Sequence, residues 1–276
     1  MLFRSGKELH QLYKEAYTPW EWHGPIMEHA HKRGLLCFSS PFDETAVDFL
    51  EELNVPLYKI ASFENTHFPL LKKVAATGKP VIMSTGVITL PELEESVAYL
   101  KANGCKQLVL LKCTSTYPAT PENTNIITIP DMRGRFGVQV GLSDHTMGIG
   151  VSVASVAFGA TVIEKHFTLN RADGGVDSAF SMEPAEMKAL VTESERAWLS
   201  VGKVNYDPTP KEMESLKFKR SIYVSQDIKQ GEILSEKNIR VIRPALGLHP
   251  KFYEQVLGKP VNRDLKQGQP LLGEYL

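Results

Sequence analysis

Cysteine is scarce in this chain of 276 residues, which also lacks long apolar runs and any excess of charge of one sign. Cys37, Cys105 and Cys113 show no Cys-x-x-Cys spacing, which argues against a disulfide framework and a zinc knuckle. No apolar run reaches membrane-spanning length, and the N-terminus lacks the apolar core of a signal peptide. Because 31 Lys and Arg residues balance 32 Asp and Glu residues without a basic stripe, neither nucleic acid nor a membrane is an expected partner. We therefore expect a soluble, cytoplasmic protein.

Short apolar runs alternate with helical patterns between Leu35 and Trp198. Strands are expected at Leu35–Ser39, Leu57–Ile60, Val81–Met83, Leu108–Leu111, Val138–Leu142 and Val162–Glu164. Helices are expected at Lys7–Tyr17, Trp20–Lys32, Thr45–Leu53, Pro69–Ala76 and Pro91–Ala102, the last with Thr89 as its N-cap. Repeated βα units of about 25 residues predict a parallel sheet covered by helices. Polar residues cluster directly after the strands, where TIM-type (β/α)8 barrels place their active sites, so that barrel is the leading fold.

The strand count falls short of that barrel. Six strands are expected instead of eight, and the first two helices come before any strand. We therefore expect a TIM-type barrel that lacks its first two βα units. An open parallel sheet exposes its edge strands. We therefore expect this chain to have low stability or low activity.

The pattern changes after Trp198. We expect a partial barrel domain over residues 1–202, a linker over 203–217 and a small domain over 218–276. In the last part, Asp227–Leu234 (DIKQGEIL) recurs 37 positions later as Asp264–Leu271 (DLKQGQPL). Each Lys-Gln-Gly fits a tight turn with glycine at positive φ. The repeat predicts a pseudo-symmetric, β-rich domain.

Two histidines stand where two of the expected strands end. Gly141-Leu142-Ser143-Asp144-His145-Thr146 closes one apolar run, and Glu164-Lys165-His166-Phe167-Thr168 closes the next, with a helical stretch between them. Adjacent strands lie about 4.8 Å apart, so the two imidazoles could converge on one divalent metal. Two structural histidines remain the alternative.

Other expected strand ends carry groups that can hold an anion. Lys59 lies inside an apolar run and is followed by Ser62 and Glu64, while Ser84 and Ser115 follow later strands. A lysine charge with several hydroxyl donors suits a molecule with a phosphate ester and a carboxylate. A buried lysine also needs an anionic partner, so a structural ion pair with Glu64 or another acid is the alternative.

Five motifs, in this order, resemble the sialic acid synthase family. They are Ser-Ser-Pro-Phe-Asp (39–43), Tyr-Lys-Ile-Ala-Ser-Phe-Glu (58–64), Ser-Thr-Gly (84–86), Gly-Leu-Ser-Asp-His-Thr (141–146) and Glu-Lys-His-Phe-Thr (164–168). The tail resembles the antifreeze-like SAF domain of the same family. Cys-Thr-Ser-Thr-Tyr-Pro (113–118) and the segment 171–181 are similar to the pseudaminic acid synthase branch.

The resemblance implies a condensation of phosphoenolpyruvate with 2,4-diacetamido-2,4,6-trideoxy-L-altrose and water, giving pseudaminate and phosphate. It implies that His145 and His166 hold Mn²⁺ or Mg²⁺ and that Glu64 transfers a proton. Asp177 and Tyr117 would contact the sugar, and Arg243 would reach the active site of the partner subunit in a homodimer. Phosphoenolpyruvate would be bound by Lys59, Ser62, Ser84, Ser115 and Ser143, with Ser40 nearby.

The chain also departs from the family, and other functions stay open. The family's Glu-Ile-x-x-Asn-His and Lys-x-Gln motifs do not occur here. The alternatives are a sialic or legionaminic acid synthase, an inactive synthase that serves as a binding or dimerisation module, and a Schiff-base aldolase that uses Lys59 or Lys165.

Overall fold

The computed structural model describes residues 9–276, and the chain divides into two compact units, Met1–Gly202 and Lys203–Leu276. Each unit is described by itself. Among the described residues, no helix has both the length and the apolar composition that a membrane span requires.

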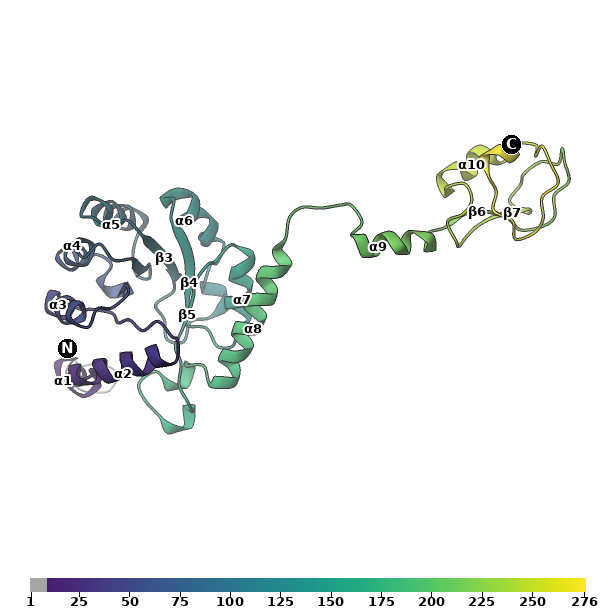
Figure 1. Cartoon of the computed structure of the whole chain (residues 1–276). Helices are drawn as coiled ribbons and strands as arrows, with labels where there is room; N and C mark the ends of the chain where they lie inside the picture. The colour runs from purple at the N-terminus through teal and green to yellow at the C-terminus, as the bar shows by residue number, and fades with distance from the viewer. Residues whose placement is uncertain (1–8) are drawn as a thin grey trace. The chain divides into compact units, whose positions relative to one another are not determined.

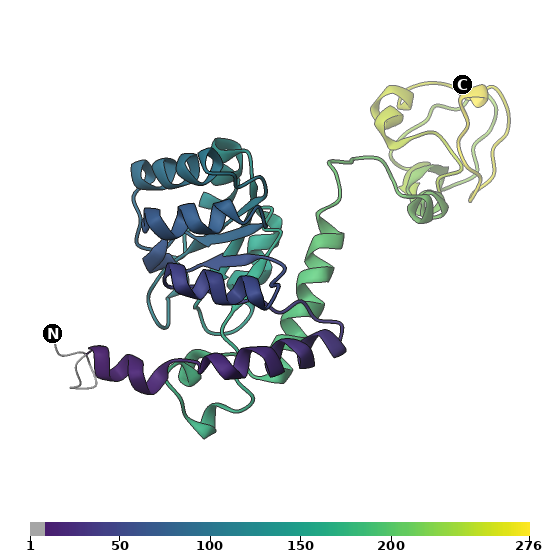
Figure 2. The same ribbon diagram turned by 60° about the vertical axis from the view of Figure 1, so that its left-hand side comes forward.

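The first unit is built on a curled parallel sheet with helices on its outer side (Figures 1 and 2). Within the described residues the sheet has five strands, which pair in chain order. They are β1 (Tyr58–Ile60), β2 (Val81–Ser84), β3 (Leu108–Cys113), β4 (Gln139–Asp144) and β5 (Ile163–Lys165). Five of the expected strands are therefore confirmed to within a few residues, and so is the α/β barrel-type architecture.

Among the residues described in this unit, three α-helices come before β1, and one α-helix follows each of the five strands. They are α1 (Leu9–Ala16), α2 (Trp20–Lys32), α3 (Glu44–Glu52), α4 (Phe68–Ala76), α5 (Leu90–Ala102), α6 (Thr128–Phe136), α7 (Gly150–Ala157) and α8 (Pro184–Val201). All the helices expected from the sequence are present, although Lys7 and Glu8 of the first lie outside the described residues. At α5 the expected N-cap forms a capping box, because Thr89 and Glu92 bond reciprocally to each other's backbone.

The segment Leu35–Ser39 is extended but is not a strand, contrary to expectation. One long backbone hydrogen bond, from Lys59 N to Ser39 O at 3.5 Å, links it to β1. Leu35 and Leu36 are 63% and 77% exposed. An apolar run alone does not make a strand; the backbone must also be paired along its length.

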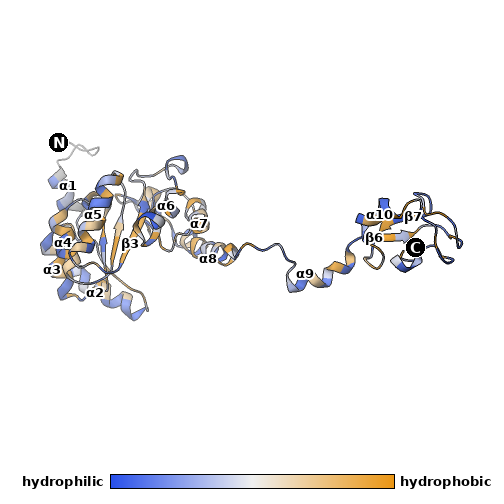
Figure 3. Cartoon of the chain, turned by 90° about the horizontal axis from the view of Figure 1, so that it is seen from above, coloured by the Kyte–Doolittle hydropathy of each residue, from blue (hydrophilic) through white to orange (hydrophobic). Residues whose placement is uncertain are grey.

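The core lies between the convex side of the sheet and the helices. Strand β3 is coloured as hydrophobic in Figure 3, and its Leu110 is fully buried. Leu50 of α3, Leu71 of α4 and Leu100 of α5 belong to the same buried cluster. The helices thus cover one face of the sheet, and the opposite, concave face is left for polar groups.

The strand register decides which side chains share that concave face. Paired residues point to the same side, and so do alternate residues along one strand. Ser84 is two residues beyond the partner of Lys59, Cys113 is two beyond the partner of Ser84, and Cys113 pairs with Ser143, which pairs with Glu164. These five residues therefore form one row across the sheet.

The second unit has a two-stranded antiparallel sheet of β6 (Ser221–Val224) and β7 (Ile239–Ile242), with the short helix α10 (Tyr253–Val256). The two repeats contact each other symmetrically: Asp264 accepts a hydrogen bond from Gln230 N, and Asp227 accepts one from Gln267 N, each at 2.9 Å. The turn glycines have φ of 84° and 83°, as expected. The unit has its own buried cluster, which includes Ile222, Leu234 and Leu265.

The expected linker is not wholly irregular. Helix α9 (Pro210–Ser215) forms within it, with Thr209 and Glu212 in a capping box and proline at the first helical position. Proline is favourable at that position, because its missing N–H would have no partner inside the helix. Proline in this segment therefore marks the start of a helix, at Pro210, as well as a break in the chain.

Candidate active site

Lys59 of β1 begins the polar row. Its side chain is buried, and Nζ donates to Ser84 Oγ at 2.8 Å and lies 3.5 Å from Glu164 Oε2. The anionic partner is thus Glu164 from β5, not Glu64, which sequence reasoning named first. The ammonium also faces a hydroxyl, so it is available to a second anion on the concave face.

Two hydroxyls meet above the turn that follows β2. Gly86 N donates to Ser62 Oγ at 3.2 Å, and an ideal Cβ built on Gly86 would collide with Ser115 Oγ. Asn65 holds this turn from below, because its Nδ2 donates to Gly86 O at 3.0 Å. A residue without a side chain therefore lets Ser62 and Ser115 approach the same point.

Cys113 is a site residue that sequence reasoning did not single out. Ser62 Oγ donates to its sulfur at 3.5 Å, and Ser115 Oγ lies 3.7 Å from it. Burial acts to raise the pKa of this thiol, but hydrogen bonds with His145, Ser62 and Ser115 outweigh that effect and lower the pKa to about 7. The thiol thus links the expected serines to the first histidine.

Ser143 and Glu164 complete the row at its other end. Ser143 Oγ donates to Glu164 Oε1 at 2.7 Å, while the other oxygen of the same carboxylate faces Lys59. Glu164 therefore contacts one expected ligand hydroxyl, Ser143, and the ammonium of Lys59 together. Ser143, like Lys59 and Ser84, was expected to bind an anion, and the structure brings all three together.

The two histidines lie side by side at the strand ends, with ring centroids 5.2 Å apart. His145 Nδ1 lies 2.9 Å from Thr114 O, and His166 Nδ1 lies 3.4 Å from Asp177 Oδ2. Because Nδ1 of each ring faces an oxygen, Nε2 is the atom left to ligate a metal, and an oxygen beside the other ring nitrogen is common around metal-bound histidines. The pair therefore fits a divalent ion held by two imidazoles.

Protonation of the two rings differs. Burial lowers the pKa of His166. For His145, burial acts in the same direction, but hydrogen bonds with Cys113 and the Thr114 carbonyl outweigh it and raise the pKa. Since only the neutral ring binds a metal, protons compete with a metal more strongly at His145 than at His166.

No third protein ligand joins them: across residues 9–276, no three His, Cys, Asp or Glu side chains gather in a geometry that could hold a metal ion. A metal held here would need solvent or substrate oxygens to complete its coordination, which makes the site open.

Aromatic rings line the histidine pair. The ring of Tyr117 lies 4.4 Å from that of His145, centroid to centroid, and the ring of Phe180 lies 5.0 Å from that of His166. Tyr117 is 41% exposed, so it can also face a bound molecule, whereas Phe180 is buried. Tyr117 and Asp177 were both expected near the sugar; Phe180 was missed.

Glu64 follows β1 beside the row. Burial raises the pKa of its carboxyl group, and its buried Oε2 has no hydrogen-bond partner among the described residues. A carboxyl group with a raised pKa and a free oxygen is suited to proton transfer near neutral pH.

Three residues named from the sequence lie elsewhere. Ser40 is half-buried in the segment before α3, and no hydrogen bond joins its hydroxyl to another described residue. Arg243 is exposed and follows β7 in the second unit. Lys165 is on the convex face, where Nζ lies 3.1 Å from Asp144 Oδ2 and donates to Thr146 O at 2.5 Å.

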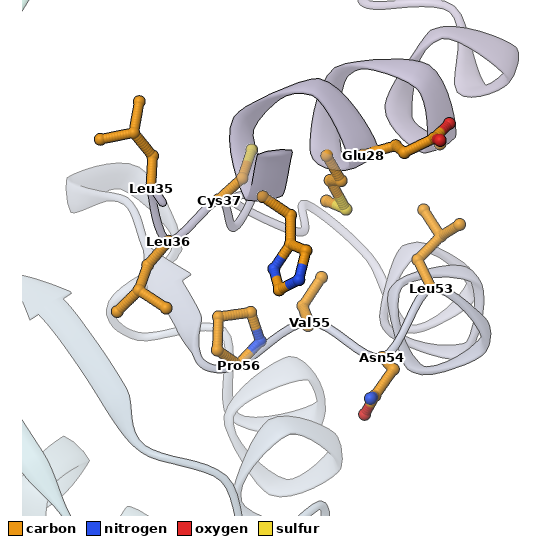
Figure 4. Close-up of a pocket in the computed structure, with 11 residues that line it drawn as sticks. Glu28, Leu35, Leu36, Cys37, Leu53, Asn54, Val55 and Pro56 are labelled. Carbon is orange, nitrogen blue, oxygen red and sulfur yellow. The ribbon is translucent and has the colours of Figure 1, made fainter. Parts of the chain in front are cut away.

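A hollow lies at the amino end of β1, away from the strand ends that carry the polar row (Figure 4). Its volume is about 440 Å³. Its lining includes Met27 and Glu28 of α2, Leu36 and Cys37 of the extended segment, and Val55 before β1. It contains none of the residues expected to act in the site.

Comparisons with known proteins identify the family of this chain. The model of the NeuB family matches residues 3–206, and that of the SAF domain matches residues 219–276. The pseudaminic acid synthase of Campylobacter jejuni subsp. jejuni is 44% identical over 265 residues, which cover 96% of this chain and 77% of that protein. The pseudaminic acid synthase of Helicobacter pylori is 42% identical over 266 residues, which cover 96% and 78%.

A solved structure shows the same fold. The N-acetylneuraminic acid (sialic acid) synthetase from Leptospira borgpetersenii aligns with a TM-score of 0.71 and 34% identity, covering 78% of this chain and 75% of that chain. Together with the two family matches, which span the barrel-type unit and the tail, these similarities confirm the resemblance inferred from the motifs. The chain belongs to the NeuB family and carries a C-terminal SAF domain.

Proposed function

We propose that this protein condenses phosphoenolpyruvate with 2,4-diacetamido-2,4,6-trideoxy-L-altrose and water to give pseudaminate and phosphate. The observation that carries the proposal is the polar row of Lys59, Ser84, Ser143 and Glu164 beside the histidine pair. Its similarity to two pseudaminic acid synthases, at 42% to 44% identity, supports the choice of sugar.

In this proposal the row binds phosphoenolpyruvate. The ammonium of Lys59 attracts its negative charge, and the hydroxyls of Ser84 and Ser115 donate to phosphate and carboxylate oxygens. Ser62 and Ser143 would donate to the same oxygens after their hydroxyls turn away from Cys113 and Glu164. Ser40 lies outside the hydrogen-bonded row, so its contribution would be indirect. Donors that are already in place before binding would orient phosphoenolpyruvate with its enol carbon facing the histidine pair and would disfavour other orientations.

The histidine pair faces the sugar aldehyde. His145 and His166 would hold Mn²⁺ or Mg²⁺, which when bound polarises the aldehyde oxygen. On the same side, the carboxylate of Asp177 would accept hydrogen bonds from sugar hydroxyls, and the hydroxyl of Tyr117 would donate or accept one. Glu64 would take up or deliver the proton that the addition of water requires, because burial raises its pKa toward the range in which a carboxyl group can both hold and release a proton.

The wider setting is also a proposal. The enzyme would act in the cytoplasm as a homodimer in which Arg243 of one SAF domain reaches the site of the partner subunit. An exposed arginine after β7 is free to meet an anionic group on another surface.

Binding and trapping experiments separate this proposal from the alternatives. Phosphoenolpyruvate should bind in calorimetry and should bind at least about 10-fold more weakly to Lys59→Ala, since hydrogen bonds to charged groups contribute about 1.5–3 kcal/mol. Lys72→Ala, on the exposed side of α4, is the matched control. No binding by the wild type would favour an inactive module, and borohydride trapping of a keto acid on Lys59 would favour a Schiff-base aldolase.

A further inference from the structure

The loop of residues 172–180, here the Asp177 loop, brings two side chains to the histidine pair. Asp177 Oδ2 lies 3.4 Å from His166 Nδ1, and the Phe180 ring lies 5.0 Å from the His166 ring. The tip of the loop is exposed, with Val176 79% exposed. Its hydrogen bonds, from Gly174 N to Arg171 O and from Ser178 Oγ to Gly175 O, each at 3.2 Å, stay within the loop and its base. Its position must therefore be fixed from its base.

Arg171 closes that base. Its Nε donates to Ser181 O at 2.9 Å, across the mouth of the loop. Ser181 in turn donates to Asp177 O from its hydroxyl at 2.8 Å and from its backbone N at 3.2 Å. A short, continuous series of hydrogen bonds thus leads from Arg171 to the residue that contacts His166.

The same arginine is tied to the start of α8. Its Nη2 pairs with Glu186 Oε2, and its backbone N donates to Glu183 Oε1 at 2.9 Å. Glu183 and Glu186 also form the capping box of α8, so both carboxylates are fixed by the helix end. The loop is therefore fastened to a long helix through one guanidinium group.

We infer that Arg171 is a positioning residue that holds Asp177 against His166 and so sets the sugar side of the site. The inference rests on the proposed function for its substrate, but the position of the loop itself does not depend on it. Only a planar guanidinium can bond to Ser181 O and Glu186 at once; a lysine keeps the charge but loses this fork. Loosening the loop should weaken sugar binding and leave the phosphoenolpyruvate row intact.

Three variants test the inference. Arg171→Lys keeps the charge, Arg171→Ala removes it, and Glu186→Gln preserves a capping-box residue while weakening the pair with Arg171. Arg196→Ala is the control, because Arg196 is exposed on α8 and pairs with Glu193 on the same helix.

The expected result is a KM for the sugar raised about 10-fold in Arg171→Lys, with the KM for phosphoenolpyruvate unchanged, since small misplacements in an active site are costly. Hydrogen–deuterium exchange should speed up within residues 172–181 and nowhere else. Arg196→Ala should change neither measurement. Glu186→Gln should raise the sugar KM and the exchange rate of the loop in the same direction, by smaller amounts. This variant still tests the inference if Arg171→Ala does not fold.

Two results would overturn the inference. One is unchanged exchange in the loop together with an unchanged sugar KM; the other is a lower melting temperature and a proportional loss of kcat with both KM values intact, which is a structural role only. If the wild type shows no turnover with these substrates, the proposed function fails, whereas the exchange measurement still decides whether Arg171 fixes the loop.

Discussion

Replacing Gly86 with alanine should weaken phosphoenolpyruvate binding with little change in the fold. The φ of Gly86 is not in the left-handed region, so the backbone can accept a side chain. The new Cβ would collide with Ser115 Oγ and would lie 2.7 Å from Ser62 Oγ, and both hydroxyls would have to rotate away. Each hydrogen bond to a charged phosphate oxygen contributes about 1.5–3 kcal/mol, so losing one weakens binding by at least about 10-fold.

The assay is titration calorimetry with phosphoenolpyruvate, combined with a thermal melt. Gly134→Ala is the matched control, because a Cβ there meets nothing within 4 Å and the residue lies inside α6. That change should leave binding unaltered and stabilise the helix by about 0.5–1 kcal/mol. If Gly86→Ala binds phosphoenolpyruvate as tightly as the wild type, the hydroxyls of Ser62 and Ser115 do not form the anion site.

Further predictions concern the metal, the proton and the tail. His145→Ala or His166→Ala should abolish stimulation by Mn²⁺ while the melt stays cooperative; full stimulation in either variant would refute a two-histidine site. Burial raises the pKa of Glu64, so its ionisation destabilises the fold as pH rises through that pKa. Glu64→Gln should therefore raise the melting temperature at about pH 8, have no effect at about pH 4 and lower kcat. A mixed dimer of Arg243→Ala and His145→Ala subunits should recover part of the activity, unless each tail serves its own subunit.

The sequence predicts most of the first unit because its strands are short apolar runs between helical patterns. The exception is Leu35–Ser39, whose composition suits a strand but which a single long backbone hydrogen bond links to β1. Helix α9 was missed for the opposite reason, since Pro208 and Pro210 favour a linker, whereas the capping box of Thr209 and Glu212 starts a helix at Pro210. Both cases show that a local pattern competes with hydrogen-bond partners supplied from elsewhere.

Some residues of the candidate site could likewise be predicted from the sequence, and others could not. Lys59 is recognisable because it lies inside an apolar run, and the histidines because each stands where an apolar run ends. Glu164 and Cys113 could also have been found, because counting alternate residues along paired strands places them on the same face as Lys59. Phe180 ends a single short 3-10 turn with no longer period to count, so its place beside His166 depends on the tertiary structure alone.

Turnover with two sugars tests the central claim most directly. Phosphate release from phosphoenolpyruvate should require a divalent metal and should proceed with a much higher kcat/KM for 2,4-diacetamido-2,4,6-trideoxy-L-altrose than for N-acetylmannosamine. Sites that hydrogen-bond a substrate group can reject an analogue lacking it by about 10⁴-fold or more. Comparable kcat/KM values for the two sugars would contradict the assignment to pseudaminate, and no phosphate release with either sugar would contradict synthase activity itself.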